Sequence, residues 1–178
     1  MELWDIYDAY RHKTGRTGVR GEPVLPGDYH LVVHLIVFNA AGQMLIQQRQ
    51  SCKRSCPDMW DITVGGCAVV GESSQEAAMR ELREELGLEI DLTDTAPDLM
   101  ITFPGGFDDM FLLERELDPA QLHLQQEEVQ AARWASREEI MAMLRDNTFV
   151  PYHPSMIDML FDLRSHGGGL TREVPPSC

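Results

Sequence analysis

The chain has 178 residues, of which 43% are apolar, and it carries a formal net charge of -14. This length and apolar content suit one domain with a substantial core. The charge excludes broad binding to a nucleic-acid polymer, which requires a basic face, and no apolar run is long enough to cross a membrane. The amino terminus lacks the apolar segment of a secretory signal, so we expect a cytoplasmic protein.

The amino-terminal residues 1–29 are expected to form an edge strand followed by a turn-rich extension. Residues 3–7 are a short apolar and aromatic run typical of an edge strand, whereas Gly and Pro punctuate the stretch that follows. Residues 31–39 are almost continuously apolar and β-branched. They predict a strand that is buried on both faces.

A second strand and a third are expected before the first helix. Residues 40–42 turn the chain into a strand at 44–49, which predicts a hairpin. Strand character returns at 60–64 after a basic loop, and Gly65 and Gly66 are expected to end that strand.

Residues 74–86 are expected to form an amphipathic helix. Ser73 followed by Glu76 predicts a capping box at its start, and Gly87 is a typical C-terminal stop. The apolar residues recur at helical spacing along one face of this helix.

Three carboxylates lie close together on the predicted helix. Glu81, Glu84 and Glu85 project within about one third of its circumference, at the border of the buried face. Arg80 can reach Glu84 at i,i+4, but one cation leaves an excess of negative charge. A dication that prefers oxygen ligands, Mg2+ or Mn2+, suits that excess, so the cluster is either a divalent-metal site or a solvated acidic face.

The rest of the chain adds strands and helices. Strands are expected at 100–103 and 110–114, around a Pro-Gly-Gly turn, and at 129–134. Ser136 with Glu139 predicts the start of a helix that runs to residue 145.

A last helix is expected at 154–163, and the tail at 166–178 lacks periodicity and is expected to be mobile. The sum is a single domain over residues 1–165 of the α/β class, with a mixed sheet between helices.

Residues 66–88 read GCAVVGESSQEAAMRELREELGL and fit the signature Gx5Ex7REUxEExGU, in which U is aliphatic. Every position is filled, so the chain resembles the Nudix family. The resemblance implies an α/β/α sandwich and hydrolysis of a diphosphate linkage in a nucleoside diphosphate linked to another group, or in a related organic diphosphate. The implied partner is a small diphosphate-containing substrate, and a homodimer is left open.

The resemblance also implies roles for individual residues. Glu81 becomes a metal ligand or the base that activates water, Arg80 resembles the residue that orients it, and Glu72 resembles an outer ligand or structural partner. The implied metal ligands are Gly66 through its carbonyl, Glu81, Glu84 and Glu85. The implied catalytic residues are Arg80, Glu81, Glu84 and Glu128.

Relatives often recruit one more acidic residue from outside this motif. The candidates are Asp108, Asp109, Glu127 and Glu128. Glu128 is placed first because EEVQAARWASREEI resembles the stretch that follows the catalytic loop in many relatives. Lys53 and Arg49 are interpreted either as phosphate contacts or as solvated surface cations.

Residues 28–134 also resemble isopentenyl diphosphate isomerase, a Nudix-fold enzyme with a catalytic cysteine. Gly65 occupies the position of that cysteine, and Cys67 that of a ligand histidine. Because glycine cannot protonate an alkene, the isomerase is kept only as an alternative. A non-catalytic nucleotide-binding domain is a further alternative, but such relatives are expected to lack carboxylates that this chain retains.

Several other residues are interpreted as structural. His30 and His34 share one side of a strand, where hydrogen-bonded structural roles are favoured over metal binding. Cys52 and Cys56 form a CxxxC without a second zinc-ligand pair, and the scattered cysteines predict no disulfide framework. No aromatic residue is assigned to a base-binding pocket.

Overall fold

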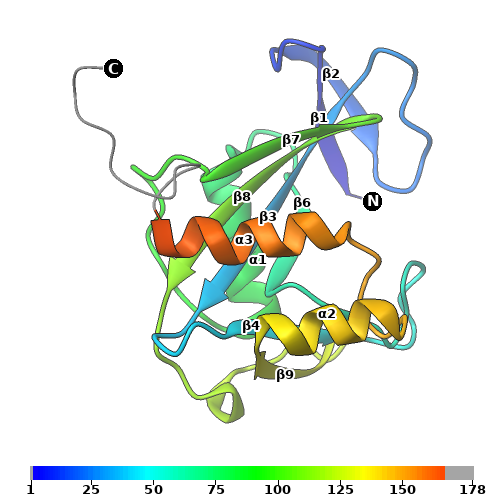
Figure 1. Ribbon diagram of the computed structural model, residues 1–178. Coiled ribbons are helices and arrows are strands. Elements are labelled where there is room, and N and C mark those ends of the chain that lie inside the picture. The colour runs from blue at the N-terminus through cyan, green and yellow to red at the C-terminus, as the bar shows by residue number, and fades with distance from the viewer. Residues whose placement is uncertain (1, 167–178) are drawn as a thin grey trace.

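The computed structural model describes residues 2–166, which form a large mixed sheet with helices on both faces and a separate two-stranded sheet (Figure 1). The strands of the large sheet are β3 (His30–Phe38), β4 (Met44–Arg49), β5 (Trp60–Asp61), β6 (Val64–Cys67), β7 (Leu99–Phe103), β8 (Gly106–Glu114) and β9 (Val129–Ala135). The small sheet pairs β1 (Leu3–Tyr7) with β2 (Lys13–Val19). The helices are α1 (Ser74–Leu86), α2 (Arg137–Arg145) and α3 (Pro154–His166), with a short 3-10 turn at Pro119–Gln121.

Strand β3 is the centre of the large sheet. It pairs in parallel with β8 and antiparallel with β6, whereas it meets β4 only through Phe38 and Met44. Beyond that pair, β4 continues antiparallel to β5 and β9. The expected β3–β4 hairpin is therefore present, but its strands separate after one residue pair. β3 then pairs with β6 and β8, and β4 pairs with β5 and β9.

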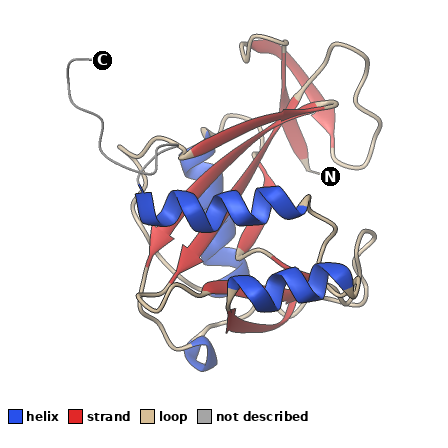
Figure 2. Cartoon of the chain, viewed as in Figure 1, coloured by secondary structure: helices blue, strands red, loops and turns tan. Residues whose placement is uncertain are grey.

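The helices form two layers that enclose the sheet (Figure 2). Val33 and Leu35 of β3 belong to a buried cluster with Leu82 of α1. Ile36 of the same strand belongs to a second cluster with Ile140 of α2, which also includes α3 residues. Successive side chains of a strand point to opposite faces, so the continuous apolar run of β3 serves both layers. The expected α/β/α sandwich with a mixed sheet is confirmed.

The expectation of a turn-rich connection after residue 7 is wrong in part, because residues 13–19 form strand β2. The first strand is an edge strand of the small sheet only, not of the large one. Trp4 lies opposite Gly18 in this pairing, and a Cβ at Gly18 would lie 2.3 Å from the indole Nε1. Gly18 therefore makes room for the Trp4 side chain within a strand, whereas in the sequence this glycine predicted a turn.

The expected strand at 60–64 is divided between two neighbours. β5 pairs with β4 and β6 pairs with β3, and Thr63 lies between them. The Thr63 hydroxyl donates to the carbonyl of Leu45 and accepts from the amide of Val37, so it bridges the diverging strands. Gly65 and Gly66 do not end the strand as expected but lie within β6.

Strand β8 begins at Gly106, earlier than the expected residue 110. Its first half contains Asp108 and Asp109, which disfavour strands in isolation. Both carboxylates are buried and paired, Asp108 with His34 and Asp109 with Arg11. Tertiary contacts therefore override the local preference.

The expected tail at 166–178 lies outside the described residues, apart from residue 166 at the end of α3. Within residues 2–166, no helix is long and apolar enough to cross a membrane.

Candidate active site

Helix α1 presents its carboxylates as the sequence predicts. Ser73 and Glu76 form the capping box, and Gly87 ends the helix with a left-handed φ of 68°. Glu81 and Glu85 are buried, with 7% and 6% of their surface exposed, whereas Glu84 is exposed. The helix therefore buries the carboxylates of Glu81 and Glu85 and exposes that of Glu84 to solvent.

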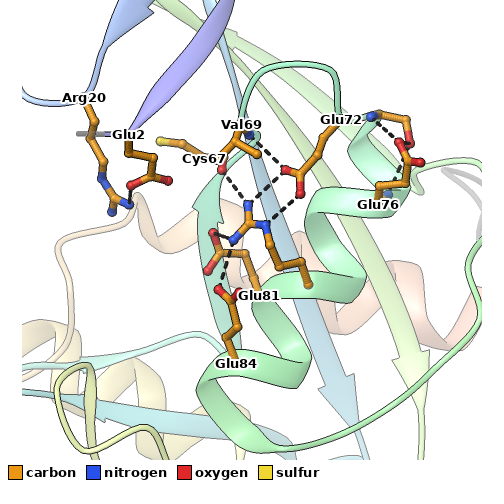
Figure 3. A network of polar contacts seen from close by, with 10 residues as sticks. Glu2, Arg20, Cys67, Val69, Glu72, Glu76, Glu81 and Glu84 are labelled. Carbon is orange, nitrogen blue, oxygen red and sulfur yellow. Dashed lines mark hydrogen bonds and ion pairs between the residues drawn. The ribbon is translucent and has the colours of Figure 1, made fainter.

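Arg80 joins the carboxylates into one network (Figure 3). Its Nε and Nη2 donate to the two oxygens of Glu72 at 2.7 and 3.0 Å, and Nη1 donates to Glu81 at 2.9 Å and to Glu84 at 3.2 Å. A further bond runs from Nη2 to the carbonyl of Cys67 at 3.0 Å. The guanidinium thus links Glu81 of α1 to the backbone of strand β6.

Glu72 is tied to the backbone as well as to Arg80. Its Oε2 accepts from the amide of Val69 at 2.9 Å. It therefore links the loop before α1 to the helix.

The two glycines of β6 face different groups. A Cβ at Gly66 would lie 2.0 Å from Oε1 of Glu81, and one at Gly65 would lie 2.5 Å from Nε2 of His34. Gly66 therefore lets the Glu81 carboxylate approach the backbone of β6. Gly65 makes room for the His34 ring, which donates to or accepts from Asp108 through Nδ1 at 2.8 Å.

Burial changes the proton affinity of the inner carboxylates. Burial raises the pKa of Glu81, against the lowering effect of Arg80. Burial and then the negative charge of Glu81 raise the pKa of Glu85 to about 8. The Nε2 of Gln47 donates to Glu85 at 2.8 Å, but this neutral contact does not offset the cost of burying the charge.

Arg80, Glu81, Glu84 and Glu85 line a cavity of about 400 Å³. Its charged lining residues are Glu2, Arg20, Lys53, Arg80, Glu81, Glu84, Glu85 and Glu128. The lining thus has five carboxylates and three cations. One of these cations, Arg80, already forms ion pairs with Glu72, Glu81 and Glu84. The cavity has an excess of negative charge that a bound cation would offset.

The donor set suits a hard dication. Carboxylate oxygens with a backbone carbonyl are the ligands that Mg2+ and Mn2+ prefer. Among residues 2–166, however, no three His, Cys, Asp or Glu side chains converge as a ready metal-binding group. In the arrangement described, Arg80 holds Glu81 and Glu84, and Gln47 holds Glu85. The residues therefore fit a metal by chemistry and charge, and their side chains must rotate to bind it.

A larger cavity of about 560 Å³ lies elsewhere, against the small sheet. Its walls include Trp4, Val24 and Leu25, and its charged pair Arg16 and Asp28 is bonded in a bidentate manner. Because that pair neutralises itself and no carboxylate cluster is present there, this cavity lacks the chemistry of the first one.

The predicted residues outside α1 separate into two groups. Lys53 and Glu128 form an ion pair and both line the acidic cavity. Arg49 does not line it, because its guanidinium is bonded to Asp61 and to the carbonyl of Ser55. Among the acidic candidates, Asp108 and Asp109 are held by His34 and Arg11, and Glu127 is exposed. Glu128 is thus the candidate that shares the cavity.

The histidines and thiols have structural surroundings. His30 is bonded to the carbonyl of Gly105 at 2.7 Å and stacks on Trp4, so both histidines are hydrogen-bonded as favoured. Cys67 is partly buried, and burial raises the pKa of its thiol to about 11. Such a thiol is a poor nucleophile at neutral pH.

Three residues near the carboxylates escape the sequence. Glu2 and Arg20, which flank the two strands of the small sheet, line the cavity. Gln47 of β4 does not line it but contacts Glu85. The Gly-rich surroundings of Arg20 carry no signal that separates it from other surface cations. These residues meet the carboxylates only through the tertiary fold.

Comparison with known proteins identifies the family. The sequence model of the NUDIX domain matches residues 28–158. A Nudix hydrolase of Listeria monocytogenes, itself uncharacterised, is 42% identical over 93% of this chain and 96% of its own length. An isopentenyl-diphosphate Delta-isomerase of Citrobacter koseri is 33% identical over 65% of this chain and 66% of its own.

The fold has solved counterparts as well. The crystal structure of DR0079 from Deinococcus radiodurans covers 89% of this chain and 97% of its own, with a TM-score of 0.72 and 23% identity, which shows the shared fold. The hydrolase match spans nearly the whole chain, whereas the isomerase match is shorter and more distant. This chain therefore belongs to the Nudix family and is a Nudix hydrolase.

Proposed function

We propose that this protein is a metal-dependent pyrophosphohydrolase that cleaves a diphosphate linkage in a nucleoside diphosphate linked to another group, or in a related organic diphosphate. The observation that carries the proposal is the acidic cavity, in which Glu81, Glu84 and Glu85 of one helix lie with Lys53. Such a cavity suits cations and, through them, the oxygens of a diphosphate.

The chemistry requires these residue types. A diphosphate repels an attacking water through its own negative charge, so positive charge and a positioned base are both needed. When bound, Mg2+ or Mn2+ would neutralise non-bridging oxygens and lower the pKa of a water. Glu84, Glu85 and the carbonyl of Gly66 are the proposed ligands, with Glu81 as a shared ligand or base.

Glu81 is the proposed acceptor of the water proton. Its raised pKa makes the carboxylate a stronger base than an exposed glutamate. Arg80 holds one of its oxygens, which positions the carboxylate. Glu128 is a proposed further acidic residue, and Lys53, its ion-pair partner, a proposed phosphate contact.

The isomerase alternative is disfavoured by the surroundings of Gly65. A Cβ there would lie 2.4 Å from Cδ2 of His34, so a cysteine would displace the ring. The space for a catalytic thiol is taken by the His34–Asp108 pair. The alternative predicts conversion of isopentenyl diphosphate to dimethylallyl diphosphate, and we expect none.

The deciding experiment is hydrolysis of a broad panel with products identified by mass. The panel contains a nucleotide sugar, ADP-ribose, a coenzyme, a noncanonical triphosphate and isopentenyl diphosphate, each with Mg2+, with Mn2+ and with a chelator. Metal-dependent cleavage within a diphosphate supports the proposal. Isomerisation, cleavage unaffected by the chelator or the absence of any turnover would each contradict it.

Two further proposals concern the cellular location and the domain organisation of the enzyme. We propose a cytoplasmic location, since Cys52, Cys56 and Cys67 are free thiols, as is usual in reducing compartments. We also propose that residues 1–165 act as one domain, because Glu2 and Arg20, which flank the two strands of the small sheet, line the cavity.

A further inference from the structure

The hairpin of β1 and β2 reaches the acidic cavity from outside the matched domain. The NUDIX match begins at residue 28, whereas Glu2 and Arg20 precede it and line the cavity. Figure 3 shows both side chains near Cys67, on the side away from Glu76. A positive charge of the hairpin thus lies at the same cavity as Glu81 and Glu84.

The hairpin is fixed to the segment that leads into α1. The amide of Val70 donates to the carbonyl of Leu3 at 3.0 Å, and the amide of Gly71 donates to Asp5 at 2.9 Å. The amide of Arg20 donates to the carbonyl of Glu2 at 3.0 Å. These bonds give Arg20 a defined position at the rim of the cavity.

Arg20 is a cation of the cavity that retains free donors. Its Nη1 donates to Glu2 at 2.6 Å, and Glu2 is its one side-chain partner within the described residues. Its side chain is 47% exposed. Arg80 is by contrast engaged by Glu72, Glu81 and Glu84 as well as a carbonyl.

Lys53 lies within electrostatic range of Arg20. Burial lowers the pKa of Lys53, and the positive charges of Arg49 and Arg20 act in the same direction, against the raising effect of Glu85 and Glu81. Lys53 and Arg20 line the same cavity, so a phosphate bound there is attracted to both cations. A diphosphate supplies several oxygens for such contacts.

We propose that Arg20 binds a non-bridging phosphate oxygen of the substrate, and that Glu2 pairs with its guanidinium in place of the phosphate while the cavity is empty. This inference rests on the proposed function and extends it to a residue outside the matched domain. The planar guanidinium can offer two parallel donors to a phosphate, which a lysine cannot.

The test compares Arg20→Gln with Arg20→Lys and with Arg16→Gln as a matched control. Arg16 lies on β2, which ends one residue before Arg20, and it is also paired with a carboxylate, Asp28, but it lines the other cavity. We expect Arg20→Gln to raise KM for the best panel substrate about 10- to 100-fold, with a smaller change in kcat, because a charge-assisted contact is lost. Arg20→Lys should lose less, and Arg16→Gln should retain wild-type KM.

Binding of methylenediphosphonate, a non-hydrolysable diphosphate, is measured by calorimetry with Mg2+ for the same variants and for Glu2→Gln. Arg20→Gln should weaken binding by a similar factor, whereas Glu2→Gln should tighten it because a competing carboxylate is removed. Equal weakening in both would show that the pair is only structural and would overturn the inference. Thermal unfolding of each variant identifies any that fails to fold. If Arg20→Gln does not fold, the KM and the affinity of Arg20→Lys are compared with those of the wild type instead, and unchanged values would overturn the inference.

The two proposals fail in different ways. If Arg20→Gln matches the wild type in KM and in affinity for methylenediphosphonate, the role of Arg20 is overturned while hydrolysis stands. If the wild type binds methylenediphosphonate through Arg20 but hydrolyses no panel member, the proposed hydrolysis fails while the role of Arg20 stands.

Discussion

Glu85 combines a buried carboxylate with a proposed metal-binding role. Glu85→Gln and Glu84→Gln are expected to reduce turnover by about two orders of magnitude or more, because each removes a charged ligand without changing side-chain volume. The amide of Gln at position 85 can still accept from Gln47, so the fold should persist. Steady-state kinetics measure turnover, and circular dichroism measures whether the fold persists. Glu138 is an exposed residue of α2, and Glu138→Gln is the control. Wild-type turnover in Glu85→Gln would sink its assignment as a ligand.

His34 gives the protein a pH-dependent contribution to stability. Burial lowers its pKa, but the hydrogen bond and charge of Asp108, with further help from Asp61 and Glu85, raise it above the ordinary value overall. Tyr152 also faces the ring, edge-on. A histidine with a raised pKa stabilises the fold fully below its unfolded pKa, and this contribution is lost as the pH rises through the folded pKa.

We therefore expect wild type to lose stability relative to His34→Gln as the pH rises from 6 to 9. Denaturant unfolding at several pH values measures the difference, and the comparison cancels the titration of groups common to both proteins. A difference that does not change with pH would show that His34 does not titrate in this range.

At the scale of elements, local signals predicted α1 fully and the small sheet poorly. The capping box, the apolar period and the terminal glycine of α1 all lie within the helix or beside it, so its carboxylates could be placed before the structure was known. Strand β2 instead depends on Trp4 packing over Gly18, a contact between strands. Arg20 and Glu2 were missed for the same reason, since no local pattern links them to α1.

Strand β6 offers a matched pair of substitutions. Gly66→Ala is expected to push the Glu81 carboxylate away from the strand and to lower kcat about 100-fold, since small misplacements of catalytic groups have effects of this order. Gly65→Ala is expected to displace the His34 ring and to lower stability by about 1–3 kcal/mol, as overpacking does in buried sites. Kinetics and denaturant unfolding of both variants separate the two effects. A larger loss of kcat in Gly65→Ala would contradict the placement of Glu81.

At the scale of the molecule, part of the acidic character lies in the cavity beside α1. The chain carries a net charge of -14, and the cavity adds buried carboxylates whose repulsion disfavours the folded state. A cation bound by these carboxylates would offset their mutual repulsion around α1. The sequence predicted the excess of charge and the reach of Arg80 to Glu84, but not the contact of Gln47 with Glu85.

Divalent metal should therefore stabilise the whole protein. A ligand that binds only the folded state at 100 times its Kd adds about 2.7 kcal/mol, and for a domain of this size about 1 kcal/mol shifts Tm by roughly 2–4 °C. We expect Mg2+ or Mn2+ to raise Tm by about 5–10 °C at such concentrations. Because salt also screens a net charge of -14, NaCl at matched ionic strength is the control for screening. The double variant Glu84→Gln, Glu85→Gln should respond to both salts alike, and a rise in its Tm specific to the divalent ion would place the metal elsewhere.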